Sequence, residues 1–228
     1  MKVGILIAVE QELKAFLSQG SEITEEEVSR RRVYHTVLGG HELYALCSGY
    51  GEIDAAAGTQ LLITRYGCEA VLNFGVAGAL TRDLQVEDLF LVRKVCHYDF
   101  DISPIDPVEK HQYLDLPDRF IPVDERLLTL AKEVLPEFRE IAVASGDRFV
   151  EEPEDKRRLA ALGCGICDME IAAIARTCFL NGVPCLSVKC ISDTFDGTGA
   201  DYAANVEKGA RKAFAALRKI LEQMKPLR

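Results

Sequence analysis

Short apolar runs that end in polar residues or glycine constrain what this chain can fold into. Such runs cover residues 3–9, 70–72 and 141–144, and residues 184–190, which include Ser187 and Lys189, are predicted to form the last strand. Runs of this length are typical of parallel strands, which helices cover on both faces. We therefore expect the chain to build its core around a sheet with buried parallel strands.

Helical patterns separate these runs along the chain. They cover residues 10–17, 53–66, 123–135, 154–162, 171–176 and 201–224. The pair Gly39-Gly40, between residues 32–36 and 42–47, predicts a hairpin and adds antiparallel pairing. The alternation of strands and helices predicts an α/β fold with a mixed central β-sheet flanked by helices.

The chain shows no internal repeat, low-complexity stretch or linker. It has 228 residues, of which 48% are hydrophobic, and this is enough apolar material for one large core. We therefore expect a single domain over residues 1–228.

Charge and cysteine usage exclude several classes of partner. The formal net charge is −9 and no basic block is present, which argues against nucleic acid and against an anionic membrane. The eight cysteines are mostly scattered through apolar segments, as expected in a reducing compartment. No apolar run has the length of a membrane span, and the first run has no cleavage site after it. We expect a cytoplasmic protein.

The stretch Phe74-Gly75-Val76-Ala77-Gly78-Ala79 reads as a glycine-bearing loop that follows a strand over residues 69–73. Glycine lets the backbone approach a ligand closely. The stretch lacks the Gly-Lys-Ser/Thr of a phosphate-binding loop and the third glycine of a dinucleotide fingerprint. A substrate loop and a tight turn remain equal alternatives.

Asp168, Met169 and Glu170 lie where a predicted strand passes directly into an Ala-rich helix. Ligands bind at the carboxyl ends of strands in open α/β sheets, and a helix start also attracts acids. The two carboxylates therefore either carry chemistry or cap the helix. This stretch alone favours the cap.

Neither a metal site nor a redox centre is expected. His97 and His111 fall in an irregular tract from residue 97 to about 122, without the fixed spacing of metal ligands. Cys164 and Cys167 have redox spacing, but Cys167 lies in a predicted strand. A redox pair needs a helix N-terminus to lower its thiol pKa.

Candidate site residues follow four predicted strands. They are Glu12, Phe149-Val150, Met169-Glu170 and Asp193. Three carboxylates around an apolar, aromatic pocket suit acid/base chemistry on a neutral, polyhydroxylated substrate, such as cleavage of a glycosidic bond. The alternative is that all three carboxylates are helix caps.

Six motifs in order resemble a known family. They are residues 2–12, Ser48-Gly49-Tyr50-Gly51, Asn73-Phe74-Gly75-Val76-Ala77-Gly78, Ser145-Gly146-Asp147-Arg148-Phe149-Val150, Asp168-Met169-Glu170 and Cys190-Ile191-Ser192-Asp193. This set is similar to that of the 5′-methylthioadenosine/S-adenosylhomocysteine nucleosidases, within the purine nucleoside phosphorylase superfamily. The resemblance covers nearly the whole chain and implies a three-layer α/β/α domain.

The resemblance implies a catalytic role for three carboxylates. Glu12 would activate the attacking water. Asp193 would protonate the purine as it leaves, and Glu170 would accept hydrogen bonds from the ribose hydroxyls. The family needs no metal or organic cofactor.

The resemblance also implies a substrate-binding set. It comprises Tyr50, Val76, Ala77, Gly78, Ile102, Phe149, Val150, Met169, Lys189 and Ser192. Phe149 would stack near the base, the Val150 backbone would pair with the base edge, and Met169 would pack on the ribose. Ile102 would face the 5′ substituent, across the interface of a homodimer. The implied partner is a small-molecule nucleoside.

Three residues depart from the family pattern. Val76 stands where the nucleosidases usually have serine, and Lys189 where they have arginine. Tyr50 stands where an aliphatic residue usually follows the Ser-Gly pair. Lysine does not replace the bidentate contact of arginine, so the reaction rate and the geometry of the attacking water depend on what these residues do here.

Three functions follow as hypotheses. The first is hydrolysis of a 5′-substituted adenosine (methylthioadenosine, adenosylhomocysteine or 5′-deoxyadenosine) to adenine and a 5-substituted ribose. The second is a phosphate-dependent purine nucleoside phosphorylase, which the negative charge of Glu12 disfavours because it would repel phosphate. The third is a non-catalytic nucleoside-binding protein.

Overall fold

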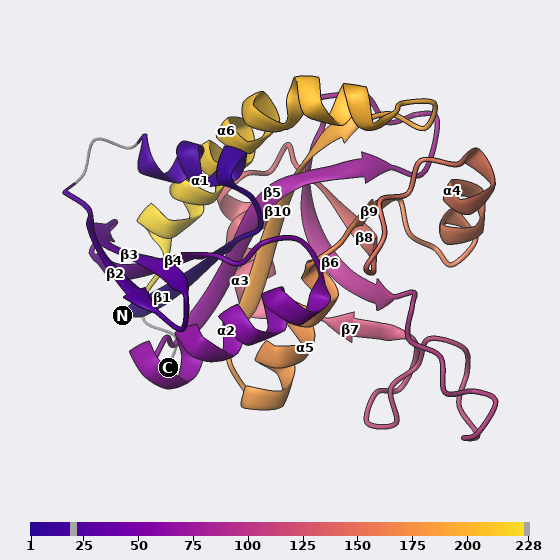
Figure 1. Ribbon diagram of the computed structural model, residues 1–228, viewed down its shortest axis with the longest axis horizontal. Helices are drawn as coiled ribbons and strands as arrows, with labels where there is room; N and C mark the ends of the chain where they lie inside the picture. The colour runs from indigo at the N-terminus through magenta and orange to yellow at the C-terminus, as the bar shows by residue number, and fades with distance from the viewer. Residues whose placement is uncertain (19–21, 226–228) are drawn as a thin grey trace.

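The predicted apolar runs form the centre of one mixed sheet in the computed structural model, which describes residues 1–18 and 22–225 (Figure 1). The strands of the described residues are β1 (Lys2–Ile7), β2 (Thr24–Val28), β3 (Arg31–Leu38), β4 (His41–Cys47), β5 (Ala70–Ala79), β6 (Leu89–His97), β7 (Phe120–Pro122), β8 (Arg139–Ser145), β9 (Ile166–Asp168) and β10 (Cys185–Asp193). Their helices are α1 (Glu10–Leu17), α2 (Glu52–Tyr66), α3 (Glu125–Val134), α4 (Pro153–Ala160), α5 (Ile171–Asn181) and α6 (Gly199–Gln223).

The strand order is β10-β6-β8-β9-β5-β1-β4-β3-β2, with β7 paired to β6. Strand β10 also pairs with β5, so β10, β6, β8, β9 and β5 close into a ring. Strands β1, β5 and β10 run parallel to one another, which brings their carboxyl ends to one edge. Strand β9 runs antiparallel to β5, and it reaches this edge because it pairs with the last two residues of β5.

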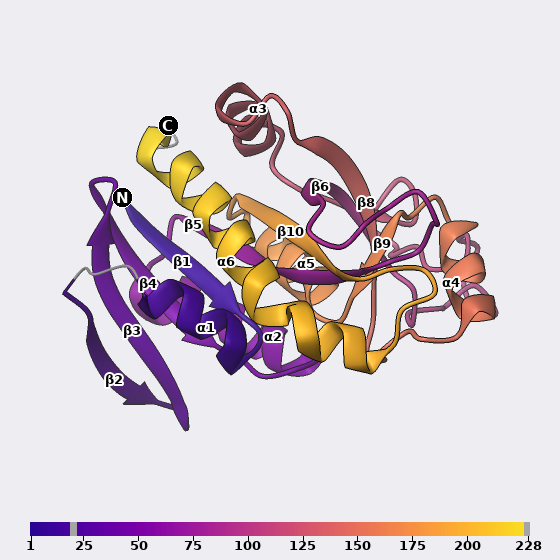
Figure 2. The same cartoon turned by 90° about the horizontal axis from the view of Figure 1, so that it is seen from above.

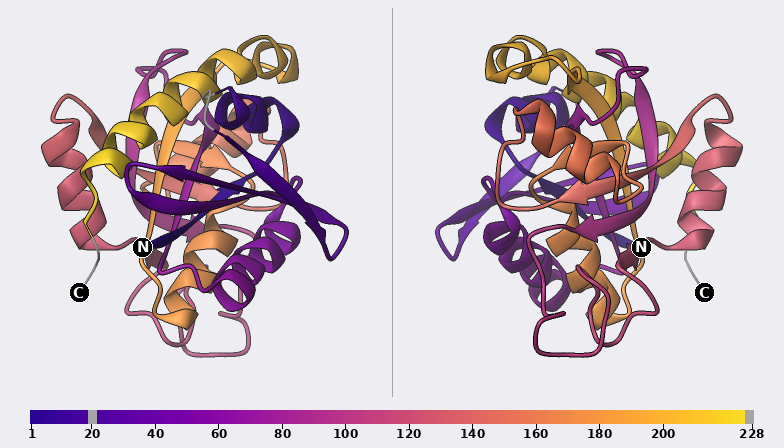
Figure 3. Two further views of the ribbon diagram at one scale, coloured as in Figure 1. Left: turned by 90° about the vertical axis from the view of Figure 1, so that its left-hand side faces the viewer. Right: turned by 90° about the vertical axis from the view of Figure 1, so that its right-hand side faces the viewer.

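Helices cover both faces of the sheet, as predicted. Helices α1 and α6 lie together on one side, and α2 and α5 lie on the other (Figures 1 and 3). Phe214 of α6 makes edge contacts with Phe16 of α1 and Phe74 of β5, at ring-centre distances of 5.9 Å and 4.9 Å. These aromatic contacts fix α1, which carries Glu12, against the sheet.

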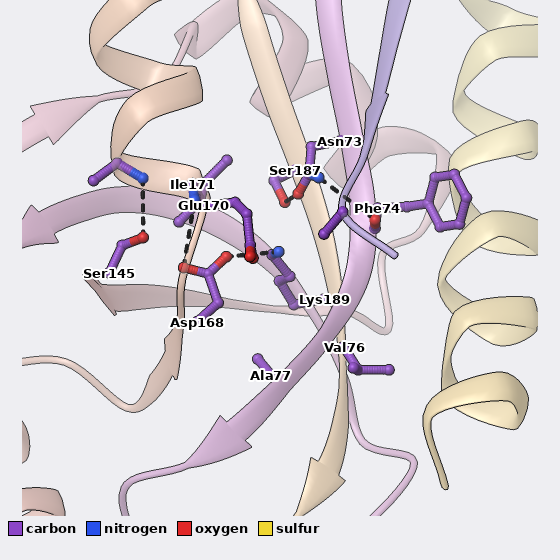
Figure 4. A network of polar contacts seen from close by, with 12 residues as sticks. Asn73, Phe74, Val76, Ala77, Ser145, Asp168, Glu170, Ile171, Ser187 and Lys189 are labelled. Atoms are coloured by element: carbon purple, nitrogen blue, oxygen red, sulfur yellow. Dashed lines mark hydrogen bonds and ion pairs between the residues drawn. The ribbon is translucent and has the colours of Figure 1, made fainter. Parts of the chain in front are cut away.

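A buried polar contact ties the three parallel strands together. The Asn73 amide of β5 donates to the Leu6 carbonyl of β1 at 3.0 Å, and the Ser187 hydroxyl of β10 donates to the Asn73 amide oxygen at 2.7 Å (Figure 4). A buried polar group is stable only with its partners in place, so this contact fixes the relative positions of the strands.

The predicted α/β fold is confirmed, but one local prediction is wrong. The glycine-bearing stretch over residues 74–79 is no loop, because β5 continues through it to Ala79 with all ten residues of the strand buried. Strand β10 on one side and β9 on the other supply its hydrogen bonds. The glycines therefore mark close approaches to the strand.

Strands β2 and β7 were not predicted. Four of the five residues of β2 are exposed, so it has no apolar pattern, and β7 has only three residues. Predicted strand and helix ends differ from the observed ones by a few residues, as expected where helices fray and strands twist. No helix in residues 1–18 or 22–225 is long and apolar enough to cross a membrane.

Candidate active site

A cavity of about 330 Å³ lies where the carboxyl ends of β1, β5, β9 and β10 meet. Its lining consists of Ala8, Val9, Glu12, Tyr50, Val76, Ala77, Gly78, Phe149, Cys167, Asp168, Met169, Glu170, Ser192, Asp193 and Tyr202. This lining is mostly apolar, with carboxylates on several walls, and includes no lysine, arginine or histidine. A mostly apolar cavity with a few convergent polar groups is typical of a small-molecule site.

Glu12 is held by three backbone N–H groups. Its Oε2 accepts from Ala8 at 3.1 Å and from Val9 at 3.4 Å, and its Oε1 accepts from Val76 at 3.0 Å. Burial raises the pKa of this carboxyl, while the charge of Lys189 and the three N–H groups act in the opposite direction. The carboxyl is therefore fixed in position and is a stronger base than an exposed glutamate.

Gly75 makes the position of Glu12 possible. A Cβ at Gly75 would lie 2.3 Å from Glu12 Oε1, which is far inside van der Waals contact. We expect Gly75→Ala to displace the carboxylate and to lower kcat about a hundredfold, because small misplacements of a catalytic group have effects of this size.

Steady-state kinetics and thermal unfolding of Gly75→Ala check this prediction. Gly199→Ala is the matched control, since its added Cβ would meet no atom closer than 3.9 Å. Equal kcat values for the two variants would contradict the role of Gly75.

A bulge in β10 places Asp193 in the cavity. The register of β10 on β5 shifts between Ile191 and Asp193, so that Asp193 lies opposite Gly78. Bulges of this kind re-aim side chains beside functional sites. A Cβ at Gly78 would lie 2.8 Å from Asp193 Oδ2, so this glycine also leaves room for a carboxylate.

Two neighbours contact the Asp193 carboxyl. The Ser192 hydroxyl donates to its Oδ1 at 2.8 Å, and the buried ammonium of Lys156 lies 4.0 Å from its Oδ2. Burial raises the pKa of Asp193, although Ser192 and Lys156 act in the opposite direction. A carboxyl with a raised pKa can hold a proton and donate it to a leaving group.

Glu170 and Asp168 share one buried cation. Lys189 Nζ lies 2.7 Å from Asp168 Oδ2, and both side chains are 3% exposed (Figure 4). Glu170 Oε1 accepts from the Gly51 N–H at 3.0 Å. Burial and the charge of Asp168 raise the pKa of Glu170 to about 8, with Lys189 opposing them. Burial would lower the pKa of Lys189, but Asp168, Glu12 and Glu170 outweigh this and raise it.

Aromatic side chains form the outer wall of the cavity. Phe149 meets Tyr202 edge to face with ring centres 5.8 Å apart, and Phe149 is 41% exposed. The hydroxyls of Tyr50 and Tyr202 lie 3.4 Å apart. A planar base can stack on such a wall, and the two phenols add polar groups at its rim.

Comparison with known proteins decides the family. Residues 2–224 match the family described as the phosphorylase superfamily. The 5′-methylthioadenosine/S-adenosylhomocysteine nucleosidase of an Exiguobacterium strain is 30% identical, with 98% of this chain and 100% of the relative covered. The chain belongs to this nucleosidase family of the phosphorylase superfamily.

Two further similarities concern Helicobacter pylori. An aminodeoxyfutalosine nucleosidase of this organism is 32% identical, with 98% of this chain and 99% of the relative covered. The crystal structure of its 5′-methylthioadenosine/S-adenosylhomocysteine nucleosidase, complexed with a pyrrolopyrimidine-bearing pyrrolidinol, has a TM-score of 0.92. That structure is 28% identical to this chain, and the match covers 98% of this chain and 99% of the neighbour. The predicted nucleoside phosphorylase-like architecture is confirmed by these neighbours.

The geometry explains two of the three departures from the family pattern. Val76 still holds Glu12, because the contact comes from its backbone N–H, while its side chain packs in an apolar cluster with Ala8, Val9 and Val206. Lys189 still supplies a cation to the acid cluster, as a single contact to Asp168. Compared with the family pattern, the chain lacks a serine hydroxyl at position 76 and a bidentate arginine contact at position 189. The contacts of Glu12 and Asp168 nevertheless hold these carboxylates in place.

Ten of the predicted site residues line the cavity and three do not. Val150 is buried in a separate apolar cluster, Ile102 lies in the connection between β6 and β7, and Lys189 lies behind Asp168. The cap interpretation is correct for Asp168, whose Oδ1 accepts from the Ile171 N–H at 3.4 Å. Glu170 lies at the N-cap of α5 but makes no side-chain cap hydrogen bond.

Sequence reasoning missed several residues of the site. Tyr202 and Cys167 line the cavity, and Lys156 supports it from behind. Tyr202 lies in the first turns of α6, four residues before the buried Val206 and on the same helical face, so its sequence position indicates core packing and not a site residue. In the described ranges 1–18 and 22–225, no group of three or more His, Cys, Asp or Glu residues could hold a metal ion.

Proposed function

We propose that this protein hydrolyses the N-glycosidic bond of 5′-substituted adenosines, releasing adenine and a 5-substituted ribose. One observation carries the proposal: Glu12 and Asp193, both buried, converge on one cavity whose lining holds no cationic side chain. A phosphate ion would meet four carboxylates there and no cationic side chain in the lining, whereas neutral water would not be repelled.

In this reaction Glu12 takes a proton from the attacking water. Asp193 donates a proton to the purine as the glycosidic bond breaks, and Glu170 binds the ribose hydroxyls. Positive charge develops on the ribose in the oxocarbenium-like transition state. The surrounding carboxylates stabilise that charge in a site where water does not screen it.

Lys189 keeps the acid cluster stable before substrate binds. Glu12, Asp168 and Glu170 all interact with this one buried ammonium. Without it, three acids in a small buried volume would repel one another and would take up protons. Glu12 would then lose its ability to act as a base.

We also propose a homodimer in the cytoplasm. Large apolar side chains are exposed on α2, on α5 and on the connection between β6 and β7, namely Ile53, Ile105, Leu114, Phe179 and Leu180. A second copy would cover such a surface. The eight free cysteines support a reducing compartment. Sedimentation at the mass of one chain, 25.2 kDa, would contradict the dimer.

Adenine release tests the proposed reaction. Methylthioadenosine, adenosylhomocysteine and 5′-deoxyadenosine are incubated with the protein, with and without phosphate, and free adenine is measured. We expect equal rates in both conditions and a reducing 5-substituted ribose as the second product. A ribose 1-phosphate product and a strict need for phosphate would establish a phosphorylase instead. Binding without adenine release would indicate a non-catalytic protein.

A further inference from the structure

A second cavity, of about 610 Å³, lies on the other side of Tyr50. Its lining includes Glu10, Arg30, Arg31, Arg32 and Tyr50. We call it the arginine cavity, because three consecutive arginines contribute to it. Its lining residues come from α1 and the residues before it, from the β2–β3 turn and β3, and from residues 47–50. Strands β2 and β3 lie at the outer edge of the sheet (Figure 2).

The arginine cavity adjoins the active-site cavity. Ala8, Val9 and Tyr50 line both of them. Tyr50 is 57% exposed, and it directly precedes Gly51, whose N–H binds the ribose-facing Glu170. A substrate with its ribose at Glu170 therefore has the arginine cavity beside it, past the Tyr50 ring.

The charges of the two cavities are opposite. The active-site lining has only acidic charged groups, whereas the arginine cavity has three guanidinium groups and one carboxylate, that of Glu10. Arg31 forms an ion pair with Asp54. Arg30 and Arg32 form no ion pair within the described part of the chain. Two cations are therefore available in a protein whose net charge is −9.

The β2–β3 turn holds these arginines in place. Ser29 and Arg30 have φ angles of 51° and 61°, which L-residues adopt rarely and which match a tight hairpin turn. Arg32 follows in β3. A hydrogen bond with the Tyr34 hydroxyl is the largest cause that raises the pKa of Arg32, and the charges of Tyr34 and Glu25 add to it. Its guanidinium remains exposed and charged.

We propose that the arginine cavity is a subsite for a carboxylate at the far end of the 5′ substituent. Arg30 and Arg32 bind that carboxylate, and this proposal rests on the proposed function. Guanidinium groups suit this role because they present several donors to a carboxylate at once. A methylthio group carries no charge and ends within the active-site cavity, so it gains nothing from the arginines.

Glu10 distinguishes two sources of such a carboxylate. Its own carboxylate would accept from the ammonium group of an aminocarboxylate, as in the homocysteinyl group. A substituent with a carboxylate alone would gain from Arg30 and Arg32 but not from Glu10. A nucleoside of each kind therefore belongs in the test.

The test compares the double variant Arg30→Gln/Arg32→Gln with the native protein. The substrates are adenosylhomocysteine, 5′-(3-carboxypropylthio)-5′-deoxyadenosine, which has the carboxylate without the amine, and methylthioadenosine. We expect kcat/KM for each carboxylate substrate, relative to that for methylthioadenosine, to fall about tenfold, mainly through KM. In the native protein, added salt should lower the same ratio, because salt screens exposed charges.

Arg211→Gln/Arg218→Gln is the matched control, since it removes two exposed arginines from α6. An unchanged ratio in the arginine-cavity variant, or the same fall in the control, would overturn the subsite. Absence of adenine release from every substrate would instead overturn the proposed reaction. In that case calorimetry measures the binding constants of the three nucleosides in both proteins. The affinity for each carboxylate nucleoside, relative to that for methylthioadenosine, then tests the subsite without turnover.

Discussion

Replacing Glu12 by Gln is expected to lower adenine release by about a hundred- to ten-thousandfold, the usual contribution of a general base. The amide cannot take a proton from water. It also presents an NH2 group to at least one of the N–H groups that the carboxylate now accepts from, those of Ala8, Val9 and Val76. The side chain therefore loses both its chemistry and part of its fixation.

Loss of activity in Glu12→Gln must be separated from loss of fold. The unmatched donors would destabilise the variant by about 1–3 kcal/mol, and removal of a buried charge would offset part of this. Thermal unfolding measures the remainder. Glu133→Gln, at an exposed position of α3, provides the same chemical change away from the cavity. If Glu12→Gln kept the same turnover as Glu133→Gln, Glu12 would not be the base.

The central strands and the three catalytic candidates could be predicted because both follow from simple chemistry. Parallel strands are buried on both faces, so they appear as continuous apolar runs. The residues that follow them meet at one edge, and this places Glu12 and Asp193 together. Glu170 joins them although β9 runs antiparallel to β5, because the end of β9 pairs with the end of β5.

The stretch over residues 74–79 could not be assigned from the sequence. Its two glycines have the local signature of a turn, and only the tertiary structure shows that each leaves room for a carboxylate, Glu12 at Gly75 and Asp193 at Gly78. Glycine in a strand and glycine in a loop have the same sequence pattern. The difference depends on residues more than sixty positions away.

Lys156 and the arginine cavity were missed for a related reason. Lys156 belongs to a charged helix that reads as a surface element, yet it is completely buried, because its ammonium donates to the carbonyls of Thr194 and Gly197. The arginines are adjacent in sequence, but nothing in their pattern places them beside Tyr50. Long-range packing decides both features.

Asp193→Asn is expected to reduce the turnover of methylthioadenosine by about a hundred- to ten-thousandfold, since an amide cannot protonate the departing purine. A substrate whose leaving group needs no proton separates this role from binding. With 4-nitrophenyl 5-methylthioriboside, the phenolate leaves without protonation, so the loss should be far smaller. An equal loss for both substrates would mean that Asp193 acts only in binding or in folding.

The pH profile of Lys156→Met tests the same acid through its neighbour. The Lys156 ammonium, 4.0 Å from Asp193 Oδ2, favours the carboxylate and lowers the pKa of Asp193. Its removal should raise that pKa and move the alkaline limb of kcat/KM to higher pH, because the acid keeps its proton longer. Lys219→Met, exposed on α6, should leave the limb in place.

A purely structural role for Lys156 predicts a different outcome. Loss of its hydrogen bonds to the Thr194 and Gly197 carbonyls would lower the melting temperature and kcat without moving the limb. Lys156→Met is expected to show both the lower melting temperature and the shift of the alkaline limb, but only the shift reports on the proton of Asp193. An alkaline limb that stays in place or moves to lower pH would show that the group titrating there is not Asp193, and the assignment of the leaving-group acid would have to change.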